Sequence, residues 1–149
     1  LVGSEMCIRD SSGSMENTIM TGDRVFGNRL AYIFGEPKRF DIIIFRYPDD
    51  EKQLFIKRII GLPGETVEIH DGQIFIDGSK TPLKDVTTKE FMQGSFGPYT
   101  VPDNCYFVMG DNRNNSKDSR YWEHTFVTDD EIVGKAFLRY WPLNKIKFL

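Results

Sequence analysis

Short runs of apolar and β-branched residues, separated by turn-forming residues, recur along the chain of 149 residues. The clearest run covers 41–47 and is closed by Pro48 and two aspartates. The next covers 53–60 and ends at Gly61-Leu62-Pro63-Gly64. Runs of this length, bounded by Pro, Gly and Asp, are typical of β-strands. We therefore predict strands over 41–47 and 53–60.

A hairpin is predicted between 66–69 and 74–76, because Asp71-Gly72 lies between the two runs. Both central residues of a type I′ turn need a positive φ, which Asp and Gly tolerate. Further strands are predicted over 105–109 and 131–141, and only 28–34 has a helical pattern. The chain is therefore expected to be mostly β, a barrel or sandwich of short antiparallel strands.

The stretch 79–102 differs in texture from these strands. It contains Pro82, Pro98 and Pro102, two glycines, and a polar cluster over 84–90. We expect this stretch to leave the main sheet as a small inserted subdomain or lid.

Composition and charge exclude several classes of function. A net charge of −3 argues against a nucleic-acid partner, since such proteins usually present a basic face. Two cysteines and two histidines are too few and too scattered for a disulfide framework or a usual metal site. The apolar runs fall far short of the ~20 residues that a membrane-spanning helix needs.

The first candidate for chemistry is Ser12-Gly13-Ser14-Met15. A serine beside a glycine is most often part of a flexible loop. A nucleophilic serine, however, needs an exposed hydroxyl beside a backbone of little bulk, and its own N–H can help hold an oxyanion. In that case the Ser12 hydroxyl could supply a second donor.

The second candidate is Lys57, which the period of a strand places on the same face as Phe55 and Ile59. A lysine in this position most often extends its amine to solvent. The alternative is a buried amine whose pKa falls from about 10.4 to about 8, which costs roughly 3 kcal/mol and yields a general base. Arg58, on the opposite face, is expected to be a structural ion-pair partner.

The third candidate is the polar loop 110–122, which directly follows the apolar run 106–109. Its composition alone is typical of an exposed surface loop. A rigid strand before it is also how many proteins position functional loops. Asp118 and Arg120 could form an ion pair there, and the Ser116 hydroxyl could orient another group.

Together, and in this order, the three motifs resemble those of bacterial type I signal peptidases, from Ser12 to the C-terminus. The resemblance implies a signal-peptidase-like coiled β fold and a serine endopeptidase with a Ser/Lys dyad. Ser14 would be the nucleophile and Lys57 the general base, and Ser12 with the Ser14 N–H would form the oxyanion hole. No cofactor and no metal are implied.

The resemblance also assigns supporting and substrate-binding residues. Ser116 would hold the Lys57 amine, and Asp118 with Arg120 would brace the loop. Shallow apolar pockets for the small residues before the cleavage site, the A-x-A pattern of signal peptides, would be lined by Met15, Ile19, Phe55 and Ile56.

The implied partners are the signal peptides of exported preproteins and a membrane lipid surface, at the outer face of the cell membrane. Phe91, Met92 and Phe96 are candidates for lipid contact, although a core role suits each of them equally. A monomer that binds no nucleic acid is expected.

Two positions depart from the family pattern, which usually has Pro where Ser11 and Asn17 stand. Residues 6–10, running into Ser11, resemble a translated sequencing-adaptor frame. We therefore expect 1–11 to be a non-native or truncated segment, the membrane anchor to be absent from this chain, and 12–149 to form the catalytic domain.

Two other classes of protein stay open at this point. One is a self-cleaving Ser/Lys peptidase of the repressor type, or a peptidase that matures conjugation or secretion substrates. The other is a β-rich binding module in which Ser14 and Lys57 are incidental. The distance between the Ser14 hydroxyl and the Lys57 amine, together with the burial of that amine, separates the enzymatic and non-enzymatic readings.

Overall fold

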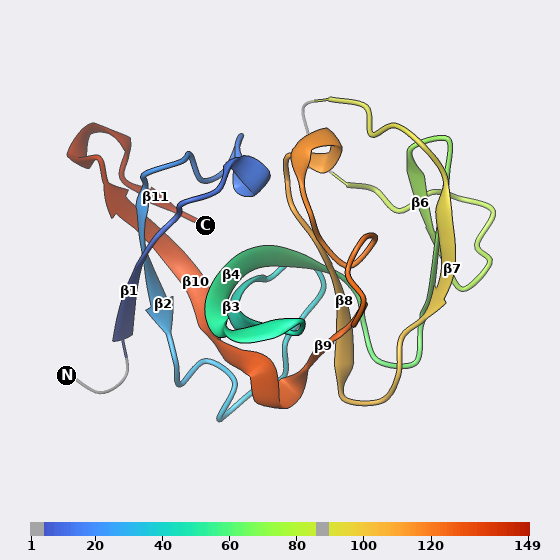
Figure 1. Ribbon diagram of the computed structural model, residues 1–149, viewed down its shortest axis with the longest axis horizontal. Coiled ribbons are helices and arrows are strands. Elements are labelled where there is room, and N and C mark those ends of the chain that lie inside the picture. Colours follow the sequence, from blue (N-terminus) through green and yellow to red (C-terminus); the bar gives the residue numbers. More distant parts are fainter. Residues whose placement is uncertain (1–4, 86–89) are drawn as a thin grey trace.

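The computed structural model describes residues 5–85 and 90–149, which form two antiparallel sheets (Figure 1). The larger sheet has the order β1-β2-β10-β3-β4-β8-β9, with β11 paired to β10, and the smaller has the order β6-β5-β7. This confirms the predicted mostly-β fold. The strands of the larger sheet are β1 (Glu5–Arg9), β2 (Arg24–Asn28), β3 (Ile42–Tyr47), β4 (Asp50–Gly61), β8 (Cys105–Met109), β9 (Val127–Thr128), β10 (Ile132–Trp141) and β11 (Lys147–Phe148).

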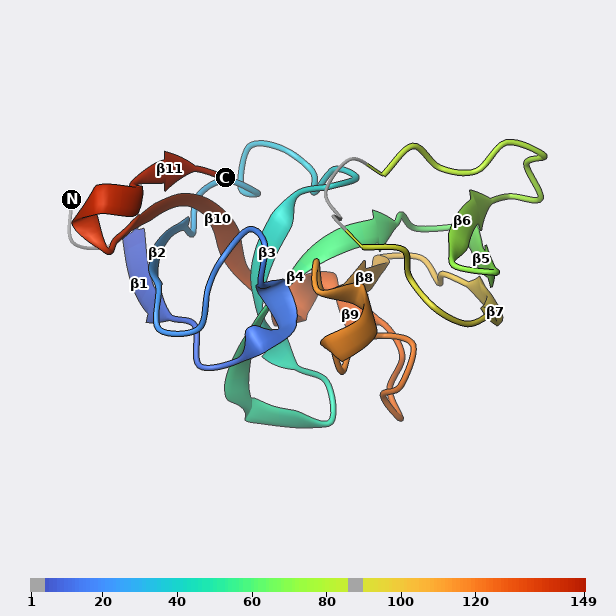
Figure 2. The ribbon, with the colours of Figure 1, turned by 90° about the horizontal axis from the view of Figure 1, so that it is seen from above.

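The smaller sheet contains β5 (Thr66–His70), β6 (Gln73–Ile76) and β7 (Phe96–Thr100). Short 3₁₀ helices connect the strands of the larger sheet: η1 (Gly13–Met15), η2 (Arg113–Asn115), η3 (Asp129–Glu131) and η4 (Leu143–Lys145). Figure 2 shows the smaller sheet at one end of the molecule and β1, β2 and β11 at the other.

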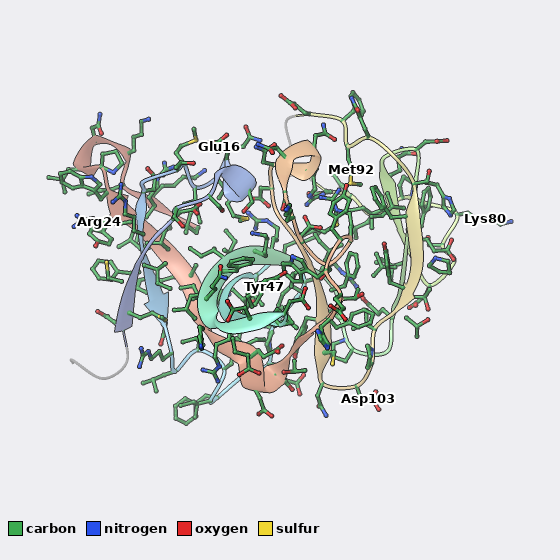
Figure 3. All side chains as sticks on the ribbon, viewed as in Figure 1. Glu16, Arg24, Tyr47, Lys80, Met92 and Asp103 are labelled. Carbon is green, nitrogen blue, oxygen red and sulfur yellow. The ribbon has the colours of Figure 1, made fainter. Side chains whose placement is uncertain are left out.

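The continuous apolar run of β3 is explained by core on both faces of the larger sheet. Ile42 and Ile44 belong to a buried cluster that includes Ile56 of β4. Ile43 and Phe45 face a second cluster, in which Ile59 and Trp122 are also buried. Residues 42–45 are therefore apolar at every position, because neither face of this part of β3 meets water. Figure 3 shows Tyr47, at the end of β3, within the curl of β3 and β4.

The predicted hairpin between β5 and β6 is present. Asp71 and Gly72 have φ angles of 47° and 77°, so both central residues of the turn are left-handed. The smaller sheet packs on its own buried cluster, to which Ile60 of β4 and Phe107 of β8 contribute. The two sheets therefore share a boundary along β4 and β8.

The stretch 79–102 divides into two parts. In its N-terminal part, Leu83 N donates to Ile74 O of β6 at 2.7 Å. Its C-terminal part forms β7, which pairs with β5. Residues 86–89 of the predicted polar cluster lie outside the described residues. The organisation as a small inserted subdomain stays a prediction.

No helix forms over 28–34, so this prediction is wrong. Asn28 ends β2, and the following residues form turns. Ile33 and Phe34 are 64% and 90% exposed, and only Tyr32 packs against a buried cluster of the sheet, so the segment has no continuous apolar face. Short helices depend on such packing for their stability, which explains why the weak helical pattern does not produce one.

Candidate active site

Two side chains from distant parts of the sequence meet between η1 and β4. The Lys57 Nζ donates a hydrogen bond to Ser14 Oγ at 2.6 Å and a second to Ile56 O at 3.1 Å. Both Ser14 and Lys57 are buried, at 7% and 3% exposure. The amine therefore does not extend to solvent, and a serine hydroxyl lies within reach for proton transfer.

Burial lowers the pKa of the Lys57 amine to about 8, against the opposing effect of the carboxylates of Asp118, Asp10 and Asp111. Removing an ammonium group from water disfavours its charged form. A substantial fraction of the amine is therefore neutral near pH 8 and able to accept a proton.

The core below η1 fixes the position of Ser14. Met15 and Ile19 are fully buried in the cluster that contains Ile56 of β4. The backbone N–H groups of Thr18 and Ile19 both donate to Met15 O, which closes the turn after η1. Apolar residues on either side of this turn thus anchor the serine against β4.

Ser12 lies beside the Ser14 hydroxyl. The two Oγ atoms are 2.9 Å apart, and the Ser12 hydroxyl also donates to Asp10 Oδ1 at 3.2 Å. The Ser14 N–H lies in the first turn of η1, where backbone donors have no acceptor within the helix. The oxyanion hole expected from Ser12 and the Ser14 N–H stays a prediction.

The loop after β8 holds η1 from the other side. Asn112 donates through its backbone N–H to Ser14 O and through Nδ2 to Gly13 O, both at 3.0 Å. Asp111 accepts a hydrogen bond from the Thr18 hydroxyl at 2.6 Å and forms a buried ion pair with Arg58. One loop therefore connects β8, β4 and the serine turn.

A second buried ion pair lies within that loop. Arg120 donates to both carboxylate oxygens of Asp118 at 2.8 Å, and its third contact is Arg113 O. The Gly110 N–H donates to Asp118 Oδ2 at 3.0 Å. Two-point Arg–carboxylate pairing fixes geometry as well as charge, which suits a bracing role.

An open groove of about 830 Å³ runs past the two side chains. The groove is lined by residues 8–14, by residues 53–57 of β4, and by the loop 114–117 with Tyr121. β8 pairs only with 58–61 of β4, so residues 50–57 have no strand on that edge among the described residues. An extended peptide could pair with this free edge.

No group of three or more His, Cys, Asp or Glu side chains among the described residues is arranged to hold a metal ion. None of the helices described is both long and apolar enough to cross a bilayer.

Comparison with known proteins identifies the family. The family described as signal peptidase, peptidase S26, matches residues 6–141. The chain belongs to this signal peptidase family. It is 38% identical to a probable signal peptidase I-2 of Synechocystis, covering 93% of this chain and 64% of that protein. It is 39% identical to signal peptidase I of Leptolyngbya laminosa, covering 91% and 68% respectively.

A solved signal peptidase I from Enterococcus faecalis V583 has the same fold, with a TM-score of 0.57 at 37% identity. The match covers 67% of this chain and 96% of that one. The chain spans about two thirds of the length of the curated relatives above. The predicted membership of the signal peptidases is therefore confirmed, and nothing in the comparisons favours the repressor-type alternative.

Only some of the residues predicted for substrate binding and support line the groove. Phe55 and Ile56 line the groove, whereas Met15 and Ile19 lie fully buried in the core beneath it. Ser116 lines the groove too, but its buried Oγ has no hydrogen-bond partner among the described residues, and Lys57 donates elsewhere. The roles assigned to these residues in substrate binding and support stay proposals.

Three residues of this signal peptidase site received no role from the sequence. Asp111 and Asn112 hold the serine turn, and Asp10 binds Ser12. Asp111 and Asn112 belong to the predicted loop 110–122, but their partners come from a remote segment, so sequence spacing gave no sign of these contacts. Asp10 lies two residues from its partner Ser12, in a segment to which the sequence assigned no function. Ile8, from β1, also lines the groove.

Proposed function

We propose that this chain is the catalytic domain of a signal peptidase I, a serine endopeptidase that removes signal peptides from exported preproteins. The observation that carries this proposal is the 2.6 Å contact between Ser14 Oγ and a buried Lys57 amine. The membership of the peptidase S26 family supports it.

In the proposed reaction the neutral Lys57 amine takes the Ser14 hydroxyl proton as Ser14 Oγ attacks the scissile carbonyl carbon. The Ser14 N–H and the Ser12 hydroxyl donate to the resulting oxyanion. The Lys57 ammonium then returns the proton to the leaving amine, which breaks the peptide bond and leaves an acyl-enzyme on Ser14. A water molecule, deprotonated by Lys57, attacks the carbonyl carbon of this ester, and Lys57 returns the proton to Ser14 Oγ as the bond between Oγ and the acyl group breaks.

The groove supports recognition of an extended segment with small side chains. The free edge of β4 offers backbone donors and acceptors to the peptide, and the apolar side chains of Ile8, Phe55 and Ile56 line the groove. Met15 and Ile19 are buried in the same cluster as Ile56, which supports shallow pockets that would suit alanine-sized residues.

We also propose that the domain acts as a monomer at the outer membrane surface, in keeping with its membrane-associated family. Of the three residues considered for lipid contact, Phe91 is 98% exposed, Met92 is buried and Phe96 is half-buried. Figure 3 shows Met92 beside the loop that carries η2, on the side of the smaller sheet. Phe91 is therefore the one of the three that is free to enter a lipid surface.

The proposal is tested with a peptide that carries Ala at the −3 and −1 positions. Cleavage after the −1 residue is expected, and Ser14→Ala or Lys57→Ala is expected to lower kcat by roughly 10⁴-fold or more. Ser79→Ala and Lys80→Ala, exposed residues outside the groove and away from β4, are matched controls that should keep full activity. Cleavage that survives either dyad substitution would refute the proposal.

A further inference from the structure

The carboxylate of Asp49 joins the tip of the β3–β4 hairpin to the loop that follows η2. Asp49 lies in the turn between the two strands and accepts hydrogen bonds from the backbone N–H groups of Glu123 at 3.1 Å and His124 at 2.8 Å. The His124 ring and the Tyr47 hydroxyl also contact it, at 2.8 Å and 2.9 Å. Figure 2 shows the hairpin tip and this loop projecting on the same side of the molecule. The proposed reaction gives these four contacts no role.

Asp49 is the acceptor in all four contacts. Burial raises the pKa of its carboxyl group, but the hydrogen bonds from His124, Tyr47 and Glu123 outweigh burial and lower that pKa from 3.8 to about 2. The group is therefore ionised near neutral pH. Since a carboxylate only accepts, the His124 Nδ1 carries a hydrogen and donates it to Asp49 Oδ1. Hydrogen bonds to an ionised group are among the stronger ones, which suits a link between two segments that are remote in the sequence.

Both segments that this carboxylate joins also line the groove. Residues 53–55 do so from the hairpin, and Tyr121 does so from the loop. The rings behind them are in contact, because Tyr47 stacks on Phe55 with centroids 4.4 Å apart and Trp122 packs edge-on against Tyr47 at 5.3 Å. Ring contacts alone leave the two segments free to slide over each other, whereas directional hydrogen bonds to backbone N–H groups fix their relative position.

Lys57 and Ser14 are held by different contacts. β8 pairs with β4 directly after Lys57, and Ile56, directly before it, is buried in one cluster with Met15. Residues 50–55 have only β3 as a strand neighbour among the described residues. Loss of the Asp49 contacts should therefore loosen the hairpin tip and leave the Lys57 amine beside the Ser14 hydroxyl.

We propose that Asp49 is a positioning residue for the peptide, which holds one wall of the groove in the arrangement that binds substrate. It acts through residues 53–55 and Tyr121 and does not itself line the groove. Without it the binding-competent arrangement is populated for only part of the time, and the apparent affinity falls by that fraction. The inference rests on the proposed function, and it predicts a rise in KM with little change in kcat.

The experiment compares Asp49→Ala with the unchanged chain on the alanine peptide. KM is expected to rise about 5- to 20-fold, with kcat within about twofold of its original value. Asp49→Asn keeps a carbonyl oxygen that can accept from His124, so KM should rise only about 2- to 3-fold. Glu131→Ala is the matched control, since it removes a carboxylate that accepts a backbone N–H, that of Thr128, away from the groove.

Amide hydrogen exchange followed by NMR measures the order of the groove wall without substrate. Exchange at Tyr121, Glu123 and His124 is expected to be at least about 10-fold faster in Asp49→Ala. The Ile59 N–H, which donates to Asp41 O beside the main sheet, should keep its rate.

An unchanged KM in Asp49→Ala would overturn the inference, as would an equal rise in Glu131→Ala or unchanged exchange at Tyr121. If Asp49→Ala does not fold, Asp49→Asn is measured in the same way, and a KM equal to that of the unchanged chain then overturns the inference. A chain that cleaves nothing would refute the proposed function, while exchange at Tyr121 would still decide whether Asp49 orders the groove wall.

Discussion

Arg58 binds both carboxylate oxygens of Asp111, with Nε to Oδ1 at 2.8 Å and Nη2 to Oδ2 at 2.6 Å. The Asp111 side chain is fully buried, and the same carboxylate accepts from the Thr18 hydroxyl. The pair therefore links β4, which carries Lys57, to the turn that follows Ser14. Arg58 has the structural role expected for the face opposite Lys57.

Asp111→Asn is expected to destabilise the fold by about 3–5 kcal/mol, because it leaves the buried Arg58 charge without its partner. The measurement is the free energy of unfolding from a denaturant titration. Lys135→Ala removes a partly exposed ion pair with Asp41 and should cost no more than about 1 kcal/mol. Equal losses in the two variants would contradict a buried role for the Arg58–Asp111 pair.

Gly110 is expected to tolerate no side chain. A Cβ at this position would lie 2.3 Å from Ser116 Oγ and 2.4 Å from Ser14 O. Gly110→Ala must therefore displace the nucleophile turn, and a shift of this kind lowers kcat by roughly 100-fold. Gly35→Ala is the control, since a Cβ there meets only Ala31 O at 3.7 Å. Full activity in Gly110→Ala would show that the contact with Ser14 does not position the nucleophile.

Much of the sheet could be predicted, because its strands carry local signals. The runs that became β3, β4, β8 and β10 are apolar and β-branched, and Asp71-Gly72 marks a turn by its own backbone preference. The strands β1 and β7 have mixed exposure and weak patterns, and they form through pairing with β2 and β5. The partner of β7 lies about 30 residues away in the sequence, and β2, the partner of β1, has only a weak strand pattern of its own.

In the site, too, some residues carry a local sequence signal and others do not. Lys57 stood out because an amine between Phe55 and Ile59 is unusual, and Ser14 because of its neighbouring glycine. The contacts of Asp111 and Asn112 depend on how the loop after β8 folds against the turn at Ser14, which no local pattern encodes. Sequence reasoning thus named the two side chains that the structure brings into contact, and missed most of what positions them.

Ser12→Ala is expected to lower kcat about 10²- to 10³-fold with little change in KM, because one of two oxyanion donors is lost. Steady-state kinetics with the alanine peptide provide the measurement. Ser12→Thr keeps a hydroxyl at the same position and should recover most of the activity. A large rise in KM at constant kcat would instead assign Ser12 to ground-state binding of the peptide.

Lys57→Met is expected to abolish cleavage and to change how stability depends on pH. The pKa of the amine is about 8 in the fold, below its ordinary value near 10.5, so between these two pH values the unfolded chain binds more protons. Stability of the unchanged chain therefore rises with pH across this window and carries its full penalty below about pH 8. That penalty is on the order of 3 kcal/mol.

Methionine removes this penalty but also the hydrogen bonds to Ser14 Oγ and Ile56 O, which are worth about 1 kcal/mol each. At pH 7 the variant should thus be more stable by on the order of 1 kcal/mol, and the rise between pH 8 and 10.5 should flatten relative to the unchanged chain. Denaturant titrations at pH 7 and pH 10 in both proteins measure the difference. The same rise in both proteins would mean that Lys57 keeps an ordinary pKa, and a general base near neutral pH would then have to be sought elsewhere.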